Sequence, residues 1–272
     1  MAEISYINVD DFTVAYRVEN PAQEKTIFFI HGNSCSSRSW NNQIKNEALS
    51  GYRLIALDLP DHGNSQAIDP TKFSVEVMAA IVGSAIRKLC QDKPFIICAI
   101  SLGTNIIAEL LDESIKPKGM LFAGPCIMGE GFEMSKLANQ SADIKALFTD
   151  EVPEDKVVAY FDIASSSQNE EDKNIFVEDF FSVKNNFRPL LFGVLTAGLL
   201  QDEIKLVTQK GCPVCIVYGE DDKIINTGYL KDAPINLWNK IIYEIPSAGH
   251  FVNMDAPTAF NKLLAGFALD MF

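Results

Sequence analysis

The sequence predicts an α/β fold: a mostly parallel, doubly wound sheet with a helical cap inserted into it. Short apolar runs of strand length alternate along the chain with amphipathic stretches at helical spacing, which is typical of a parallel sheet with helices on both faces. The alternation stops after the sixth strand and resumes near residue 211. We therefore expect residues 1–123 and 211–272 to form one core and residues 124–210 to form the cap.

Length and charge limit the functions that the chain can have. With 272 residues, 47% of them hydrophobic, the chain can bury one large core. A formal net charge of −13 disfavours nucleic acids, anionic lipid surfaces and highly phosphorylated ligands. The first residues contain neither a basic segment nor an apolar run of the length of a signal peptide or membrane span. We expect a cytoplasmic protein that takes a small neutral or cationic molecule.

The elements follow in order from the positions of apolar residues. Residues 4–9 and 12–18 alternate as the two strands of an antiparallel hairpin at the sheet edge. Apolar runs predict buried strands at residues 26–30, 53–58, 95–98, 119–123, 213–218 and 240–245. Helices of the core are expected over residues 37–49, 74–90 and 102–111.

The fifth predicted strand meets the following helix at Ser101, within the run Ala-Ile-Ser-Leu-Gly at residues 99–103. Only one or two residues are available for the turn, so it must be sharp, and Ala99 and Gly103 supply the small neighbours that it needs. This is the nucleophile-elbow pattern with alanine in place of the first glycine. Such a turn lifts the serine hydroxyl above the sheet edge and directs the N–H of Leu102 at whatever reacts there.

A catalytic interpretation of Ser101 needs a base and an acid elsewhere, because the motif alone also occurs by chance. Asp221 and Asp222 lie just past one predicted strand, and His250 lies just past the next. These groups fall at the same carboxyl edge of the sheet as Ser101, in the chain order Ser, Asp, His that this elbow requires. We predict His250 as the base and prefer Asp222 over Asp221 as the acid.

Gly32 and Asn33 directly follow the apolar strand at residues 26–30. A glycine after a buried strand lets the backbone turn tightly and expose an N–H, so the Asn33 amide is a candidate donor to an oxyanion. The alternative is a serine-rich loop that only caps the next helix. The presence of Ser101 favours the oxyanion hole.

The cysteines and the other histidines do not suggest a metal or redox centre. Six cysteines lie mostly in or beside apolar segments, which is typical of buried reduced thiols. Cys212 and Cys215 have the spacing of a redox or zinc motif, but no second pair accompanies them. The three histidines are far apart in the sequence, and we expect His62 to brace its loop. No metal and no organic cofactor is predicted.

The predicted cap at residues 124–210 is rich in Phe and Met and contains no convincing strand. An insertion at this point would lie over the carboxyl edge of the sheet as a lid. Most of its apolar side chains should pack within the cap, but an insertion of this size cannot bury all of them, so some should line an apolar pocket. Residues 165–173 are expected to form a solvated loop.

Together these motifs resemble the α/β-hydrolase superfamily over nearly the full chain. The resemblance rests on His-Gly-Asn at residues 31–33, Asp-Leu-Pro-Asp-His-Gly-Asn-Ser at 58–65, the elbow, Gly-Glu-Asp-Asp at 219–222 and Ala-Gly-His at 248–250. Two positions depart from the superfamily pattern, namely Ala99 in the elbow and Asp61 where glycine is usual. Neither removes a catalytic group, and both would reshape the pocket.

Within that superfamily, two segments resemble the N-acyl-homoserine lactone lactonases, which are quorum-quenching enzymes. They are His-Gly-Asn-Ser-x-Ser-Ser at residues 31–37, followed by Trp40, and Glu-Asp-Lys-Val-Val-Ala-Tyr at residues 154–160. The resemblance implies that Tyr160 contacts the lactone and that Ser34 and Trp40 are further substrate-binding candidates.

The residues and the resemblance together predict a serine hydrolase that opens the ring of N-acyl-homoserine lactones. Ser101 would attack the carbonyl with His250 as base, Asp222 would orient His250, and the N–H groups of Asn33 and Leu102 would stabilise the oxyanion. The substrate would be small, neutral and amphipathic, with an acyl chain in the apolar pocket. The alternatives are a carboxylesterase acting on other apolar esters and a small-ligand receptor or signalling protein of the same fold.

Overall fold

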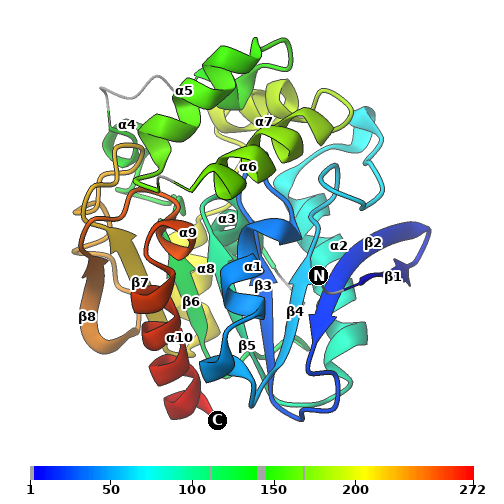
Figure 1. Cartoon of the computed structure of the whole chain (residues 1–272), viewed down its shortest axis with the longest axis vertical. Helices are drawn as coiled ribbons and strands as arrows, with labels where there is room; N and C mark the ends of the chain where they lie inside the picture. Colours follow the sequence, from blue (N-terminus) through cyan, green and yellow to red (C-terminus); the bar gives the residue numbers. More distant parts are fainter. Residues whose placement is uncertain (1–2, 111, 140–144, 168) are drawn as a thin grey trace.

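The computed structural model describes residues 3–110, 112–139, 145–167 and 169–272 (Figure 1). The strands in these residues are β1 (Ile4–Val9), β2 (Phe12–Glu19), β3 (Thr26–Ile30), β4 (Arg53–Leu57), β5 (Phe95–Ile100), β6 (Met120–Ala123), β7 (Val214–Gly219) and β8 (Leu237–Ile245). They form one sheet in the order β1-β2-β4-β3-β5-β6-β7-β8. β2 pairs antiparallel with β1 and β4, and the other pairings are parallel, which confirms the predicted fold class.

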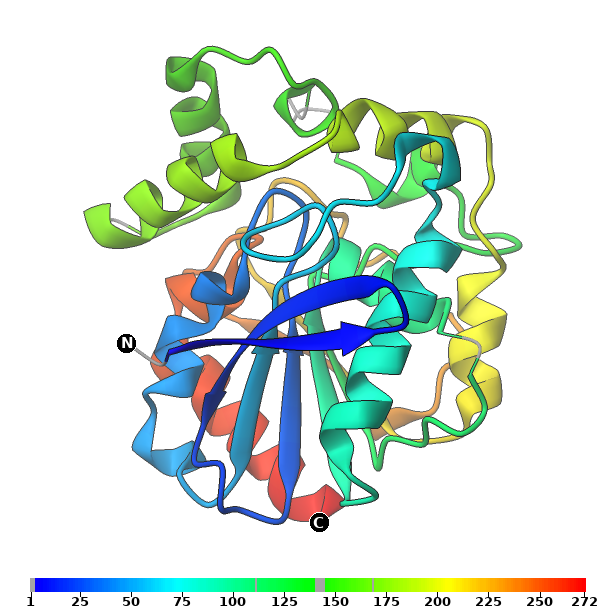
Figure 2. The same ribbon diagram turned by 90° about the vertical axis from the view of Figure 1, so that its right-hand side faces the viewer.

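Helices cover both faces of the sheet (Figure 2). In the turned view α1 (Asn41–Ile44) and α10 (Pro257–Met271) lie on one side of the strands. On the other side lie α2 (Val75–Cys90) and α8 (Glu203–Lys210), and α3 (Leu102–Ala108) packs against both of them. Every residue of β3 and β5 is buried between these layers, as their unbroken apolar sequences predict.

The cap lies above the carboxyl edge of the parallel strands (Figure 2). Its helices are α4 (Met134–Leu137), a 3₁₀ turn (Lys145–Phe148), α5 (Glu154–Ala164), α6 (Glu170–Ser182) and α7 (Phe187–Thr196). α8 falls within the predicted insertion but packs beside the sheet, so the helices over the edge end with α7. Within the described ranges no helix is long and apolar enough to cross a membrane.

Apart from shifts of a few residues at strand ends, three predicted elements differ from the structure. The helix expected over 37–49 is broken into the 3₁₀ turn Ser37–Trp40, α1 and the 3₁₀ turn Glu47–Leu49, because the Asn46 side chain accepts from the N–H of Ala48 and starts a new turn. The helix expected over 102–111 ends at Ala108, and Leu111 lies outside the described residues.

The solvated loop expected over 165–173 is the third difference. Its second half forms the first turn of α6, which Asn169 caps by accepting from the N–H of Glu171. Its first half is fixed to the core, because the N–H groups of Ser166 and Ser167 donate to the Asp255 carboxylate at 3.0 and 3.1 Å. Ser166, Asn169, Glu170 and Glu171 are exposed as expected, but the segment is not a free loop.

Candidate active site

The turn between β5 and α3 holds Ser101 in a strained backbone conformation, with φ 52° and ψ −126°. Non-glycine residues rarely adopt this conformation, and it persists where the surrounding structure imposes it. Gly103 is part of that surrounding: a Cβ at this position would lie 2.7 Å from the carbonyl oxygens of Ile30 and His31. Gly103 thus lets α3 pack directly against the end of β3, and this packing maintains the sharp turn at Ser101.

Asp222 and His250 are brought together by the ends of β7 and β8. Asp222 Oδ2 lies 2.9 Å from His250 Nδ1, and both side chains are buried. The other carboxylate oxygen, Oδ1, accepts from the backbone N–H groups of Ile224 and Ile225 at 2.8 and 2.9 Å. Because a carboxylate accepts hydrogen bonds, the Nδ1 of His250 carries the proton and its Nε2 is left as an acceptor. Asp221, the alternative acid, is exposed.

A close approach of two backbone segments makes this pair possible. A Cβ at Gly219, the last residue of β7, would lie 2.2 Å from the carbonyl oxygens of both Ala248 and Gly249. The backbone N–H of His250 also donates to the carbonyl of Ala164, at the end of cap helix α5, at 2.7 Å. The histidine is therefore positioned by the core and the cap together.

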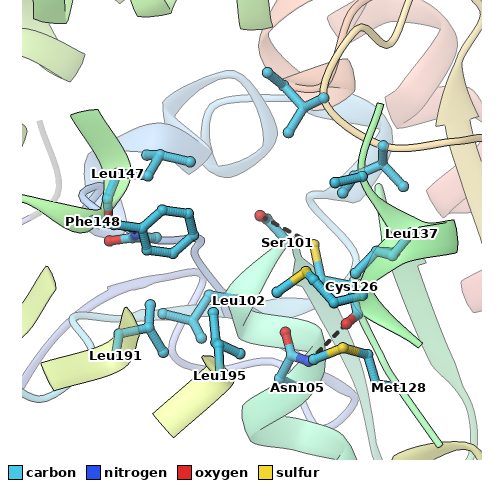
Figure 3. A pocket seen from close by; sticks show the side chains of 15 residues that line it. Ser101, Leu102, Asn105, Cys126, Met128, Leu137, Leu147, Phe148, Leu191 and Leu195 are labelled. Atoms are coloured by element: carbon cyan, nitrogen blue, oxygen red, sulfur yellow. Dashed lines mark hydrogen bonds between the residues drawn. The ribbon is translucent and has the colours of Figure 1, made fainter. Parts of the chain in front are cut away.

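The Ser101 hydroxyl contacts Cys126 in this conformation (Figure 3). Its Oγ lies 3.6 Å from Cys126 Sγ, and no hydrogen bond joins it to His250 within the part of the chain that is described. Burial raises the pKa of the Cys126 thiol to about 12, so the sulfur is protonated and is a poor nucleophile at neutral pH. Transfer of the serine proton to His250 requires the Ser101 hydroxyl to come within hydrogen-bond distance of Nε2.

The backbone N–H groups of Asn33 and Leu102 are the predicted oxyanion donors. Both residues line the same cavity as Ser101. Neither N–H donates to a backbone or side-chain acceptor in the described ranges, and that of Leu102 belongs to the first helical residue, which has no partner within a helix. The Asn33 side chain fixes its loop, donating to the Leu147 carbonyl at 3.0 Å and accepting from the Ser34 hydroxyl at 2.9 Å.

An apolar cavity opens at Ser101 and extends beneath the cap (Figure 3). The space inside it that the centre of a water molecule can occupy is about 80 Å³, and the cavity is open to solvent at its mouth. The described residues that line it include no lysine, arginine, aspartate or glutamate. Those contributed by the insertion include Met128, Met134, Leu147, Phe148, Leu191 and Leu195. Part of the Phe and Met content of the insertion thus lines a pocket, and much of the rest packs within the cap.

The three substrate contacts implied by resemblance lie outside the residues that line this cavity. Trp40 is fully buried between Phe29 and Phe260, with ring centroids 5.0 and 6.2 Å away. Ser34 is buried and donates to Asn33. Tyr160 is buried in α5, where burial raises the pKa of its hydroxyl well above the usual value. A substrate role for them stays a prediction.

His62 holds the loop that follows β4. Its Nε2 accepts from the Ser34 N–H at 3.2 Å, and its Nδ1 lies 2.9 Å from the Pro60 carbonyl. Complete burial lowers the pKa of His62 well below its usual value and keeps the ring neutral. These contacts show that His62 braces its loop, as expected. In the same described residues, no three His, Cys, Asp or Glu side chains are grouped as metal ligands.

Sequence reasoning missed two polar neighbours of Ser101. Cys126 appeared only as one of several buried thiols, and its contact depends on where the chain turns after β6. Asn105 lines the cavity and was not singled out. A signal was present for Asn105, since it is an amide one turn into the predominantly apolar helix that begins at the elbow.

The chain belongs to the alpha/beta hydrolase family, whose model matches residues 27–263. Among curated proteins, a 2-hydroxy-6-oxononadienedioate/2-hydroxy-6-oxononatrienedioate hydrolase of Paraburkholderia phymatum is 20% identical over 98% of this chain and 96% of its own length.

Solved structures of the same fold include a lactonase and an esterase. The N-acyl homoserine lactonase AidH, complexed with N-butanoyl homoserine, superposes with a TM-score of 0.87 at 22% identity and covers 99% of this chain and 97% of its own. A thermophilic esterase from Thermogutta terrifontis superposes with a TM-score of 0.76 at 15% identity, over 99% of each chain. At these identities the likeness shows the shared fold.

Proposed function

We propose that this hydrolase opens the lactone ring of N-acyl-homoserine lactones by hydrolysis. The observation that carries the proposal is the uncharged apolar cavity that begins at Ser101 and lies under the cap, because a fatty acyl chain attached to a neutral lactone matches it in polarity. The likeness to a lactonase over nearly the whole chain supports the same choice.

In this proposal Ser101, His250 and Asp222 act as a catalytic triad. Ser101 Oγ attacks the lactone carbonyl while Nε2 of His250 takes its proton, and Asp222 holds the ring through Nδ1. The ring C–O bond then breaks, and His250 returns the proton to the leaving alkoxide. A water activated by His250 releases the hydroxy acid and restores Ser101.

The backbone N–H groups of Asn33 and Leu102 stabilise the tetrahedral oxyanion. Both lie beside Ser101 on the cavity wall and are free of partners in the described ranges. Loss of one such donor costs on the order of 3 kcal/mol in the activation free energy. No metal or organic cofactor is required for this chemistry.

The charge of the site favours a neutral substrate over the diacids named for the curated relative. A dioate carries two carboxylates, and burying an unpaired carboxylate is costly. The described residues of the cavity wall offer no lysine or arginine to pair with one. The overall charge of −13 also repels anions.

All six cysteines are free thiols, which agrees with a reducing cytoplasmic compartment.

A carboxylesterase acting on open-chain apolar esters is the second candidate. The same cavity accepts an acyl chain whether or not the scissile ester is cyclic, and an esterase shares the fold over nearly the whole chain. The two functions differ in the preferred alcohol part of the substrate.

Mass spectrometry of N-hexanoyl homoserine lactone incubated with the wild type and with Ser101→Ala, both in chelator, tests the proposal. The wild type should add one water to the lactone, and the variant should not, although circular dichroism shows both folded. Hydrolysis by the variant would contradict the serine mechanism. Conversion of open-chain esters alone would favour the carboxylesterase, and tight binding without turnover of either would favour a receptor.

A further inference from the structure

Asn105 is the polar side chain nearest to Ser101 along helix α3 on the cavity wall. It lies four residues after the serine, which is the N-cap of α3. Asn105 is 4% exposed and lines the same cavity as Ser101 and Leu102. A buried amide in an otherwise apolar wall is costly unless its donors and its acceptor find partners.

The amide nitrogen of Asn105 is fully engaged. Nδ2 donates to the Cys126 carbonyl at 2.8 Å and to Glu203 Oε2 at 2.9 Å. A carbonyl only accepts, and Glu203 Oε2 also accepts from the N–H of Met128 at 2.6 Å, so the amide cannot flip. The orientation of the side chain is therefore fixed by its partners.

The amide oxygen of Asn105 has no such partner. Figure 3 shows Oδ1 pointing into the cavity, away from the Cys126 carbonyl that holds the nitrogen. No hydrogen bond from the described residues reaches it. Glu203, which anchors the nitrogen, is buried, and burial raises its pKa well above the usual value. Asn105 Oδ1 is thus a hydrogen-bond acceptor of fixed orientation in the cavity, and no donor among the described residues reaches it.

We infer that Asn105 Oδ1 accepts a hydrogen bond from the amide N–H of the substrate. This inference rests on the proposed lactonase function. In an N-acyl-homoserine lactone the amide nitrogen is bonded to the carbon next to the scissile carbonyl. When that carbonyl meets Ser101, a hydrogen bond of usual length from the N–H spans the remaining distance to a residue one helical turn away. Asn105 therefore selects lactones that carry an α-acylamino group.

A structural role for Asn105 is the competing explanation, since its nitrogen ties α3 to Cys126 and to Glu203 of α8. The two roles differ in what they do to selectivity. Loss of a purely structural contact lowers the rates for all substrates together. Loss of the acceptor lowers only the rate for a substrate that has the N–H donor.

The test compares two lactones with the wild type and with Asn105→Ala. One is N-hexanoyl homoserine lactone, and the other is its analogue in which CH₂ replaces the amide N–H. We expect the wild type to prefer the amide by about tenfold or more in kcat/KM, because the analogue leaves a buried acceptor unsatisfied. In Asn105→Ala the ratio should fall to near one. Glu203→Gln, which keeps a carbonyl acceptor for the Asn105 nitrogen, is the matched control and should keep the preference.

Equal rates for the two lactones in the wild type would overturn this inference and leave the lactonase proposal intact. An unchanged ratio in Asn105→Ala would assign the residue a structural role and would also overturn it. Failure to open either lactone would overturn the proposed function and this inference together.

Discussion

The Asp222 carboxylate is fixed on both sides, by two backbone N–H groups at Oδ1 and by His250 at Oδ2. We predict that Asp222→Asn lowers kcat by about 10⁴-fold with little loss of stability. The new amide oxygen still accepts from the backbone, and its NH₂ then faces Nδ1, which moves the ring proton to Nε2 and removes the base. Asp221→Asn changes an exposed neighbour and should stay within about twofold. Comparable losses in both variants would contradict the assignment.

Asp61 is a buried carboxyl at a left-handed position, with φ 67°. Burial raises its pKa to about 6, and its Oδ2 has no hydrogen-bond partner in the described chain. Since the folded-state pKa lies above the usual value, the stability that protonation provides is present at low pH and is lost as the pH rises from about 4 through 6.

The variant Asp61→Asn removes this titration. Asparagine tolerates the backbone conformation and keeps an oxygen for the N–H of Ile68. Relative to the wild type, its free energy of unfolding should rise by roughly 1–2 kcal/mol between pH 4 and pH 7, with allowance for solvent screening. Urea unfolding at several pH values measures this difference. A difference that does not change with pH would show that Asp61 is not the titrating group.

At the scale of elements, the ends of β7 and β8 approach so closely that Gly219 has no room for a side chain. We predict that Gly219→Ala costs about 2–3 kcal/mol of stability and lowers kcat/KM, because the backbone that carries His250 must move. Gly51→Ala is the matched control, since a Cβ there meets nothing within 4 Å. Thermal unfolding and turnover of both variants test this prediction. Wild-type stability and turnover in Gly219→Ala would contradict the close approach of the two backbone segments.

Cap helix α7 forms part of the cavity wall through Leu191 and Leu195, where the proposed function places the acyl chain. Leu195→Trp should fill the cavity and lower kcat/KM for long-chain lactones by about tenfold or more, while a butanoyl lactone changes little. Leu199→Trp introduces the same side chain at a position that is 66% exposed and should have no effect. If Leu195→Trp lowered the rates for both chain lengths equally, the acyl chain would lie elsewhere.

Sequence patterns predicted the sheet better than the short helices. Strands buried on both faces give unbroken apolar runs, and β3 was predicted with the bounds that the structure shows, Thr26–Ile30. The segment over 37–49 has no such pattern, and local side-chain bonds such as that of Asn46 decide where each turn begins. β8 begins at Leu237, earlier than its apolar run, because its pairing with β7 contains a register shift that the sequence does not reveal.

The chemical groups of the site were easier to predict than its walls. Ser101, Asp222 and His250 each follow a recognisable strand, and topology brings strand ends together. The cavity wall depends on how the cap packs, which no local pattern encodes. The resemblance that made Trp40 a substrate-binding candidate did not indicate that its ring packs between Phe29 and Phe260, and Asn105 was not singled out.

For the molecule as a whole, the net charge of −13 distinguishes neutral from anionic substrates. We predict that kcat/KM for a neutral lactone changes by less than about twofold between low and high salt. An analogue with a carboxylate at the end of its acyl chain should react slowly and gain with salt, because screening shortens the range of the repulsion. A strong salt dependence for the neutral lactone would contradict this reasoning. Initial rates over a salt series provide the measurement.

In the proposed mechanism, Ser101 opens a cyclic ester through a covalent intermediate. Since the alcohol of a lactone stays tethered after the ring opens, the acyl-enzyme must carry the mass of the entire substrate, whereas an open-chain ester would leave only its acyl part. Intact-protein mass spectrometry after rapid acid quenching with N-hexanoyl homoserine lactone, followed by peptide mapping, measures this directly. We predict an adduct of the full lactone mass on the peptide that contains Ser101. Turnover that persists in Ser101→Ala, with no adduct on the wild type, would contradict the account.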